Sequence, residues 1–119
     1  MSIELYVQGE KADIYVYVDS GGQQLAADFI DQLDESDQKK VLQLLRRFAQ
    51  KGEIHNREKF RLEEKPIYAF KSFQIRILCF FLPDAAKRTI VLTHGLKKKQ
   101  DKLSRSELDK ANRIYNECI

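Results

Sequence analysis

The stretch IYAFKSFQIRILCFFL, residues 67–82, decides the fold, because it combines aromatic and β-branched side chains around one polar interruption. Such side chains suit a pleated, half-buried surface, and the polar residues 71–74 stand where the chain can turn. We therefore expect two antiparallel strands in this stretch. Pro83 and Asp84 then mark a further turn, and TIVLTH, residues 89–94, predicts another strand.

Apolar residues also alternate near the beginning of the chain. Ile14, Val16 and Val18 are separated by tyrosines, which is the period of two typical of a strand, and residues 3–7 show a weaker form of the same pattern. The fold is therefore expected to begin with a strand or with a hairpin of two strands.

Two runs with helical spacing follow a pair of glycines. The apolar stripe of the first run contains Leu25, Phe29, Ile30 and Leu33. The stripe of the second run contains Val41, Leu44, Leu45 and Phe48. Ser36 is the expected N-cap of the second helix, and Gly52 is expected to end it. Because the link between the two runs is short, we expect the helices to form an antiparallel hairpin against the sheet.

A capping box predicts one more helix near the end of the chain. Ser104 and Glu107 have the S-x-x-E spacing, and Leu108, Ala111 and Tyr115 continue along one helical face. The expected fold class is α+β, with a small antiparallel sheet packed with an N-terminal helical hairpin and a C-terminal helix. We expect a single domain over residues 1–119, since a chain of 119 residues suits one hydrophobic core.

The composition favours a folded domain with a heavily charged surface, because 43% of the residues are hydrophobic and 33% are charged. No apolar run approaches the roughly 20 residues of a membrane helix, and no signal-peptide pattern is present, so we expect a cytoplasmic protein with no membrane partner. Cys79 and Cys118 lack the CxxC spacing of a metal or redox site, and we expect both to be reduced packing residues.

Charge is distributed unevenly along the chain. The formal net charge of +3 is by itself a weak argument for a nucleic-acid partner. Acidic residues dominate residues 28–37, however, whereas residues 57–71 and 87–102 are mostly basic. The later part of the chain is therefore expected to present a positive surface.

Arg76 is the single charge inside the apolar run FQIRILCFF. An unpaired guanidinium is costly to bury, so this side chain must reach water, a carboxylate or a ligand phosphate. A structural ion pair with Glu63, Glu64 or Asp84 and the recognition of a phosphate by a bidentate fork remain open as alternatives.

His94 ends a predicted strand, and Lys97, Lys98 and Lys99 follow it directly. An imidazole can move a proton near neutral pH, and ammonium groups can stabilise the charge that builds up on a phosphorane. Lysine runs are also common on solvated surfaces, which is the simpler interpretation of these three residues.

A second basic group precedes the strand that contains Tyr68 and Lys71, and it consists of His55, Arg57, Lys59 and Arg61. These cations could line the same groove as His94 from the other side, where Tyr68 could stack on a base, although a tyrosine in a strand more often packs in the core. The two histidines lie too far apart in the sequence to indicate a metal site, and no glycine-rich phosphate loop or G-x-S-x-G elbow occurs.

Two segments carry a family resemblance, EKFRLEEKPIYAFKSFQIRILCFF at residues 58–81 and IVLTHGLKKKQDKLSRSELDKA at residues 90–111. Together they resemble the RelE/ParE toxin superfamily, closest to its phage-derived Gp49-like and HigB-like branch, over residues 14–115. The resemblance implies a toxin of a type II toxin–antitoxin pair, a metal-independent endoribonuclease that cuts ribosome-bound mRNA and is held inactive by a cognate antitoxin protein. It implies no cofactor, and a reaction in which the ribose 2′-hydroxyl attacks the adjacent phosphate.

The resemblance also implies roles for individual residues. The matching positions assign catalytic roles to Arg76, His94, Lys71 and Lys98, with His94 as the base and Arg76 as the clamp on the transition state. They assign RNA binding to Lys59, Arg61, Tyr68, Lys97 and Lys99.

Three departures from the family pattern leave other functions open. Ala69 stands where the branch often has glutamate, Leu96 where it often has an aromatic residue, and Ser104 where proline commonly begins the last helix. Loss of the carboxylate at position 69 is compatible with a detoxified binding protein, and a ParE-like inhibitor of DNA gyrase is the other alternative. The target codon, the antitoxin and any self-association are not determined by the sequence.

Overall fold

A six-stranded mixed sheet forms the centre of the computed structural model, which describes residues 2–98 and 102–119. Across the sheet the strands are β1 (Ser2–Gln8), β2 (Ala12–Val18), β6 (Arg88–Lys97), β5 (Ile75–Phe81), β4 (Ile67–Ser72) and β3 (Phe60–Glu64). All neighbouring strands are antiparallel except β2 and β6, which run parallel with Ile14 opposite Ile90.

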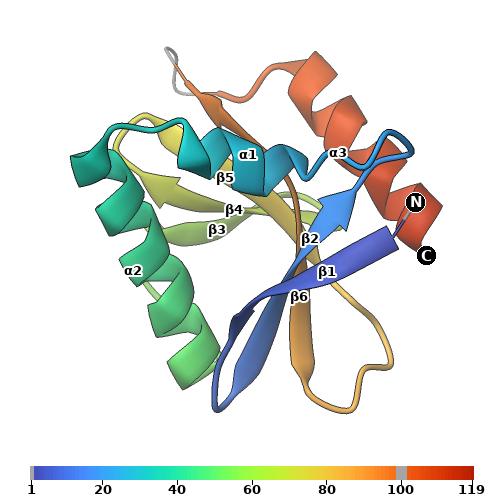
Figure 1. Ribbon diagram of the computed structural model, residues 1–119, viewed down its shortest axis with the longest axis horizontal. Helices are drawn as coiled ribbons and strands as arrows, with labels where there is room; N and C mark the ends of the chain where they lie inside the picture. Colours follow the sequence, from blue (N-terminus) through green and yellow to red (C-terminus); the bar gives the residue numbers. More distant parts are fainter. Residues whose placement is uncertain (1, 99–101) are drawn as a thin grey trace.

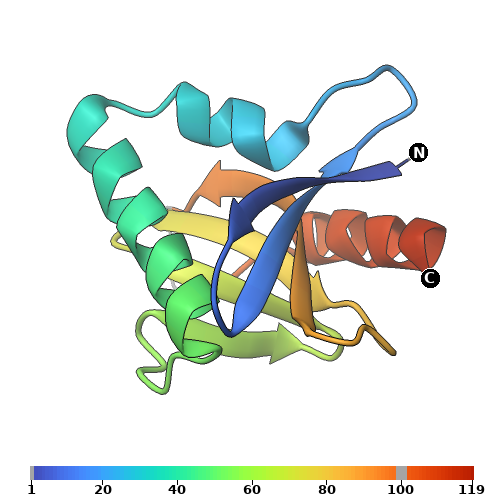
Figure 2. The ribbon, with the colours of Figure 1, turned by 60° about the horizontal axis from the view of Figure 1, so that its bottom comes forward.

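Three helices cover the two faces of this sheet (Figures 1 and 2). The helices are α1 (Leu25–Asp31), α2 (Glu35–Lys51) and α3 (Arg105–Cys118). Helices α1 and α2 contribute to the core on one face, and α3 packs on the opposite face against β4, β5 and β6. None of the three described helices is long and apolar enough to cross a membrane.

The predicted fold class was wrong. The sheet is large and mixed instead of small and antiparallel, and the chain begins with a strand pair instead of a helical hairpin. Helices α1 and α2 each pack mainly on the sheet, α1 against β2 and β6 and α2 against β1, β2 and β4. Apolar periodicity shows which face of an element is buried, but it does not show which distant strand lies beside it or in which direction, and so it missed the β2–β6 pairing.

Several local predictions are confirmed. The stretch at residues 67–82 forms β4 and β5, and the early alternating residues form the antiparallel pair β1 and β2. Helix α2 ends at Gly52, whose φ of 83° is the left-handed conformation that glycine adopts readily. The N-cap of α2 is Asp34 and not Ser36, because the Asp34 carboxylate accepts a hydrogen bond from the Asp37 amide at 2.8 Å.

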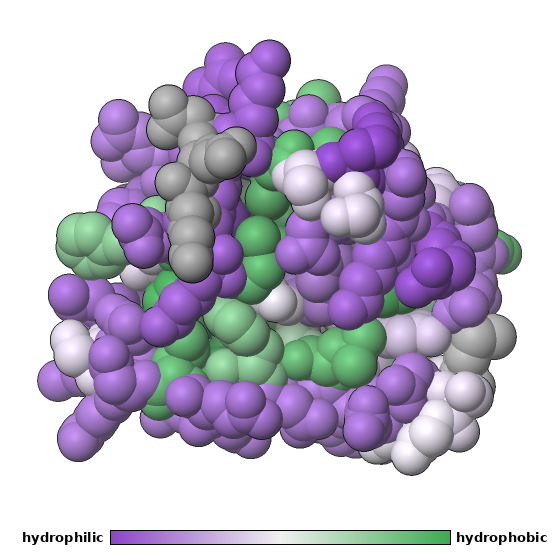
Figure 3. Space-filling view, turned by 90° about the horizontal axis from the view of Figure 1, so that it is seen from above, coloured by the Kyte–Doolittle hydropathy of each residue, from purple (hydrophilic) through white to green (hydrophobic). Residues whose placement is uncertain are grey.

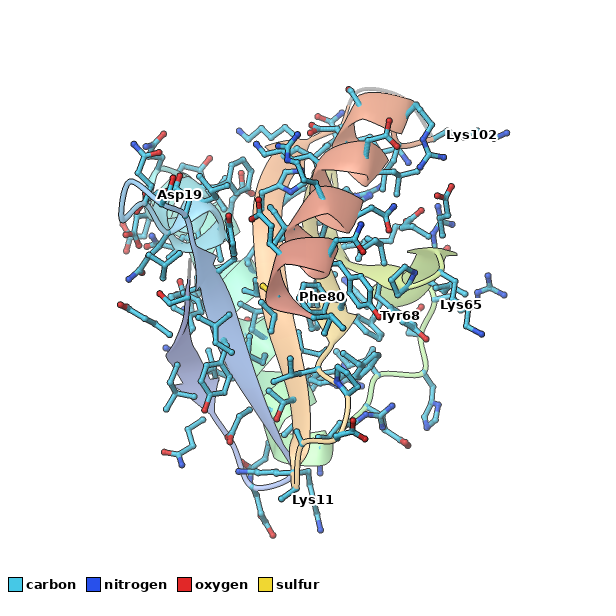
Figure 4. All side chains as sticks on the ribbon, turned by 90° about the vertical axis from the view of Figure 1, so that its right-hand side faces the viewer. Lys11, Asp19, Lys65, Tyr68, Phe80 and Lys102 are labelled. Carbon is cyan, nitrogen blue, oxygen red and sulfur yellow. The ribbon has the colours of Figure 1, made fainter. Side chains whose placement is uncertain are left out.

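The core has two parts because the sheet is covered on both faces. Aromatic rings dominate the part beneath α2, where Phe48 lies 5.5 Å from Phe70 and 5.2 Å from Phe60 between ring centroids. On the other face, Phe80 meets Tyr115 of α3 edge to face at 5.0 Å, and Figure 4 shows Phe80 beneath that helix. Strand β5 contributes side chains to both parts and therefore lies at the centre of the fold.

Gly95 allows α1 to approach β6 closely, and we predict that Gly95→Ala destabilises the protein. A Cβ atom at this position would lie 2.2 Å from the Phe29 ring, so the ring or the helix must shift. Overpacking of this kind costs about 1–3 kcal/mol, which urea denaturation will measure. Gly21→Ala is the matched control, since its Cβ would meet no atom closer than 3.5 Å. Equal stability of the two variants would contradict the proposed packing role.

Candidate functional site

The pairing of β3, β4 and β5 brings several cations to the face of the sheet that α3 partly covers. Lys71 lies directly opposite Arg76 across β4 and β5, and Arg61 lies opposite Ala69 across β3 and β4. Ala69 belongs to the apolar cluster beneath α3, so side chains at alternate positions along these strands point to the same face. Lys98, just beyond β6, is close enough for its charge to interact with all three cations. We call Arg61, Lys71, Arg76 and Lys98 the basic cluster.

Arg76 is buried in this cluster, with 9% of its surface exposed. Its Nη1 donates hydrogen bonds to the backbone oxygens of Phe73 and Ile75, which ties the side chain to the β4–β5 turn. Its Nε is buried and has no hydrogen-bond partner within the described part of the chain. A buried donor without an acceptor is unfavourable, and an anion bound beside it would supply the missing acceptor.

Lys71 and Lys98 are ammonium groups that repel one another and their neighbours. Burial lowers the pKa of Lys98 below its ordinary value, and the positive charges of Arg76, Arg61 and Lys71 lower it further. Burial likewise lowers the pKa of Lys71, with added repulsion from Arg61 and Arg76. Each lysine therefore gives up its proton more readily than an exposed lysine does.

Glu63 is the carboxylate that partly balances these charges. Its side chain is only 8% exposed, and it accepts a hydrogen bond from Arg61 Nε at 3.0 Å. The same carboxylate counteracts the lowering of the Lys71, Arg76 and Lys98 pKa values. Glu58 also raises the pKa of Lys71, so these two carboxylates act on four cations and leave a surplus of positive charge, which favours an anionic ligand.

His94 is on the same face but outside the basic cluster, because it lies opposite Leu78, further along β5, and is covered by α3. Its Nε2 lies 3.2 Å from Glu107 Oε1, and its Nδ1 lies 3.1 Å from Thr93 Oγ1. Only 3% of the residue is exposed. Burial lowers its pKa, as do the charges of Lys110 and Arg113, whereas Glu107 opposes the shift. The imidazole thus connects β6 to α3.

The predicted RNA-binding residues are divided among several surfaces. Lys59 lines a hollow of about 310 Å³ beside α2, and Lys97 lines a different hollow of about 280 Å³. Tyr68 lies on the opposite face of the sheet from the basic cluster, with its ring stacked on Phe60 at 5.4 Å and edge to face with Phe81 at 5.0 Å. Lys99 lies outside the residues that the structure describes.

Ala69 is fully buried between Arg61 and Leu78 in the strand register. A glutamate at this position would point to the face that carries Arg61, Lys71 and Arg76, but at a place where the apolar cluster beneath α3 begins. The alanine contributes no charge to this face.

Sequence reasoning missed residues that complete this region. Lys40 and Arg47 of α2 line the same hollow as Lys59, and their i, i+7 spacing on one helical face could have indicated it. Arg105 of α3 donates to both oxygens of Glu64 on β3 at 2.6 and 2.7 Å, a contact between segments too distant for any local pattern to reveal. Hydrophilic side chains dominate the surface that surrounds the start of α3 (Figure 3), and Lys102 lies there as well (Figure 4).

In residues 2–98 and 102–119, no group of three or more histidine, cysteine, aspartate or glutamate side chains is arranged to hold a metal ion.

Comparison with known families gives a match to the family described as phage-derived protein Gp49-like (DUF891), over residues 28–116. The chain has no significant match among curated proteins. The matched range contains all the residues of the basic cluster, together with His94 and Glu107.

His94 should make the stability of the protein depend on pH. Because its pKa is lowered on folding, the unfolded chain takes up the proton first as the pH falls. The stabilisation from neutral His94 is complete above its ordinary pKa of about 6.5 and is lost toward the lowered folded value, at no more than about 1.4 kcal/mol per pH unit. Urea denaturation between pH 5 and pH 8 measures the free energy of unfolding, and its slope against pH should be smaller for His94→Gln than for the wild type. His55→Gln, at an exposed site, should keep the wild-type slope, and a wild-type slope in both variants would contradict this role.

The pKa of Lys98 should rise when Arg76 is replaced by methionine, because burial remains while the charge that repels the Lys98 ammonium most strongly is removed. Titration of the lysine side chains by NMR will measure the shift. Lys39→Met removes a charge on α2, outside the basic cluster, and should leave the Lys98 pKa unchanged. An unchanged Lys98 pKa in a folded Arg76→Met protein would show that the two side chains are not neighbours in solution.

Proposed function

The chain belongs to the family of phage-derived Gp49-like proteins, and we propose that it is the RNA-cleaving toxin of a type II toxin–antitoxin pair. The Gp49-like family is part of the RelE/ParE-like toxin superfamily, it is associated with toxins that generally have ribonuclease activity, and such systems imply an antitoxin partner. Our proposal goes further in three respects: a HigB-like branch, ribosome-bound mRNA as the substrate, and therefore action in the cytoplasm.

The basic cluster is the observation that carries this proposal. It places a buried arginine with an unpartnered Nε next to two lysines of lowered pKa. A phosphodiester fits this arrangement, since its oxygens accept hydrogen bonds from the guanidinium and its charge offsets the surplus positive charge. Burial and this repulsion both lower the lysine pKa values, which makes the two ammonium groups better proton donors than exposed lysines.

The proposed reaction is a transesterification within the RNA strand. The ribose 2′-oxygen attacks the adjacent phosphorus, a new O2′–P bond forms, and the P–O5′ bond breaks. The proton of the 2′-hydroxyl goes to a base, and an acid gives a proton to the departing 5′-oxygen. The products are a 2′,3′-cyclic phosphate and a free 5′-hydroxyl, so the reaction requires no redox partner and no water in its first step.

The geometry supports a specific division of roles. Arg76 contacts the phosphate and stabilises the negative charge of the pentavalent transition state. Lys71 and Lys98 carry the protons, because their pKa values are lowered and their side chains belong to the cluster. In this proposal His94 is a positioning residue, since α3 covers it and its ring nitrogens face Glu107 and Thr93. Arg61, Lys59 and Lys97 bind the RNA backbone.

Induction of the protein from a tightly controlled promoter, followed by mapping of new RNA 5′ ends, tests this function. We expect reproducible cuts within translated frames that carry 5′-hydroxyl groups. Arg76→Ala should reduce the cutting by about 100-fold, which is the size of effect typical for loss of one transition-state donor. Lys65→Ala, at an exposed position in the β3–β4 turn that Figure 4 labels, is the control and should cut like the wild type.

Three results would contradict the ribonuclease proposal. Growth arrest without new 5′ ends would favour a protein target such as gyrase, and so would full toxicity of a variant that lacks both Arg76 and Lys98. Expression without growth arrest or cutting would favour a detoxified binding protein. In that case Ala69→Glu tests whether the missing carboxylate is responsible.

A further inference from the structure

Phe73 is the most exposed of the large hydrophobic residues that the structure describes, with 74% of its surface exposed. It stands first in the two-residue turn between β4 and β5, where Ser72 pairs with Ile75. Its φ is 55°, whereas Gln74 next to it does not have a positive φ. This is the pattern of a type II′ turn, in which glycine normally takes the first position. A bulky aromatic side chain is therefore an unfavourable choice for folding at this place.

The surroundings of Phe73 are cationic. The hollow of about 310 Å³ beside α2, which we call the α2 groove, is lined by Lys40, Gln43, Leu44, Arg47, Lys59, Lys71, Ser72 and Phe73. None of these described lining residues is acidic. The Nζ of Lys40 lies over the Phe73 ring, 4.7 Å from its centroid, and so covers one face of the ring.

A second hollow lies on another side of Phe73. It has a volume of about 280 Å³ and is lined by Asp37, Phe73, Gln74, Ile75 and Lys97. The Phe73 side chain therefore forms a ridge between two depressions. With Lys40 over one face of the ring, the remaining exposed surface offers a platform on which a flat group can stack.

Lys71 is common to the α2 groove and the basic cluster, which lie on opposite faces of the sheet. It lines the groove, and it also pairs with Arg76 in the basic cluster. The backbone oxygen of Lys59 accepts a hydrogen bond from the Lys71 amide at 2.8 Å, so the backbones of the two lysines lie side by side. A polyanion that places one phosphate at Arg76 therefore has further cations within reach along its path.

We propose that the α2 groove binds the RNA strand next to the scissile phosphate, with one base stacked on Phe73 and neighbouring phosphates on Lys40, Arg47 and Lys59. This inference rests on the proposed ribonuclease function. A single-stranded RNA fits because unpaired bases stack on aromatic rings while cations follow the backbone. An amphipathic helix of a protein partner fits less well, since Leu44 and Phe73 are the only large apolar residues among the described residues that line the groove.

The experiment measures the affinity of a fluorescein-labelled 12-nucleotide RNA by anisotropy. The RNA carries 2′-O-methyl groups throughout, so no 2′-hydroxyl is available for cleavage. Phe73→Gly and Lys40→Ala should each weaken binding, Phe73→Gly by about tenfold or more, and Phe73→Tyr should retain it because the ring remains. Lys39→Ala, one residue away on a different side of α2, is the matched control and should bind like the wild type.

Thermal denaturation distinguishes this role from a structural one. Phe73→Gly places glycine at the position where glycine is preferred, so its midpoint should equal or exceed that of the wild type while its RNA affinity falls. A structural role predicts a fall in the midpoint and no selective loss of affinity. The opposite signs of the two effects would support the inference.

Three outcomes would overturn the inference, and they differ from one another. Unchanged affinity in Phe73→Gly, with RNA cutting in cells still dependent on Arg76, would refute the groove and leave the proposed function intact. Polyglutamate serves as a second probe. If Lys40→Ala loses binding to polyglutamate but keeps the RNA affinity of the wild type, the groove is assigned to an acidic protein segment. A wild-type protein that neither binds the 12-nucleotide RNA nor cuts RNA in cells would refute the inference together with the function on which it rests.

Discussion

A guanidinium held inside a buried strand is the constraint on which the rest of the structure depends. Strand β5 is buried along most of its length, because α2 and its neighbours cover one face and α3 covers the other. Arg76 is the single charge in this strand, and two turn carbonyls satisfy only one of its nitrogens. Taking a guanidinium out of water costs several kcal/mol, and Glu63 balances only part of the positive charge here, so an anion bound at this end of the α3 face would be stabilising.

The other cations around Arg76 increase this unfavourable energy in the free protein. Lys71 and Lys98 stand near like charges, and this repulsion adds to burial in lowering their pKa values. Such a cluster opposes folding and favours any ligand that brings negative charge. The extensive core around Phe48 and Phe80 supplies the stability that allows the repulsion to persist. This is the usual relation between a strained functional site and the scaffold that holds it.

Local features of this protein could be predicted from its sequence, and pairings between distant segments could not. Alternation and capping patterns located β2, β4, β5 and the first turn of α3, because these depend on neighbouring residues. The parallel pairing of β2 with β6 depends on contacts between residues about 75 positions apart, such as Ile14 and Ile90, and no local pattern specifies them. For the same reason the sequence identified Arg76 as exceptional but could not show that α3 covers His94. The opposite directions of Tyr68 and Lys71, three positions apart in β4, could by contrast have been predicted from strand alternation.

The position of His94 ties α3 to the strand that leads to the basic cluster. Through Glu107 the imidazole holds the first half of α3 against β6, and the Arg105–Glu64 pair holds its start against β3. Together these contacts fix the start of α3 on the sheet. The basic cluster lies beside the part of the sheet that α3 leaves uncovered. An RNA phosphate and an acidic antitoxin segment would both relieve the same repulsion at that opening. Substrate and inhibitor would then compete through one electrostatic interaction, so the inhibitor needs no contact with the proton-carrying atoms to prevent the reaction.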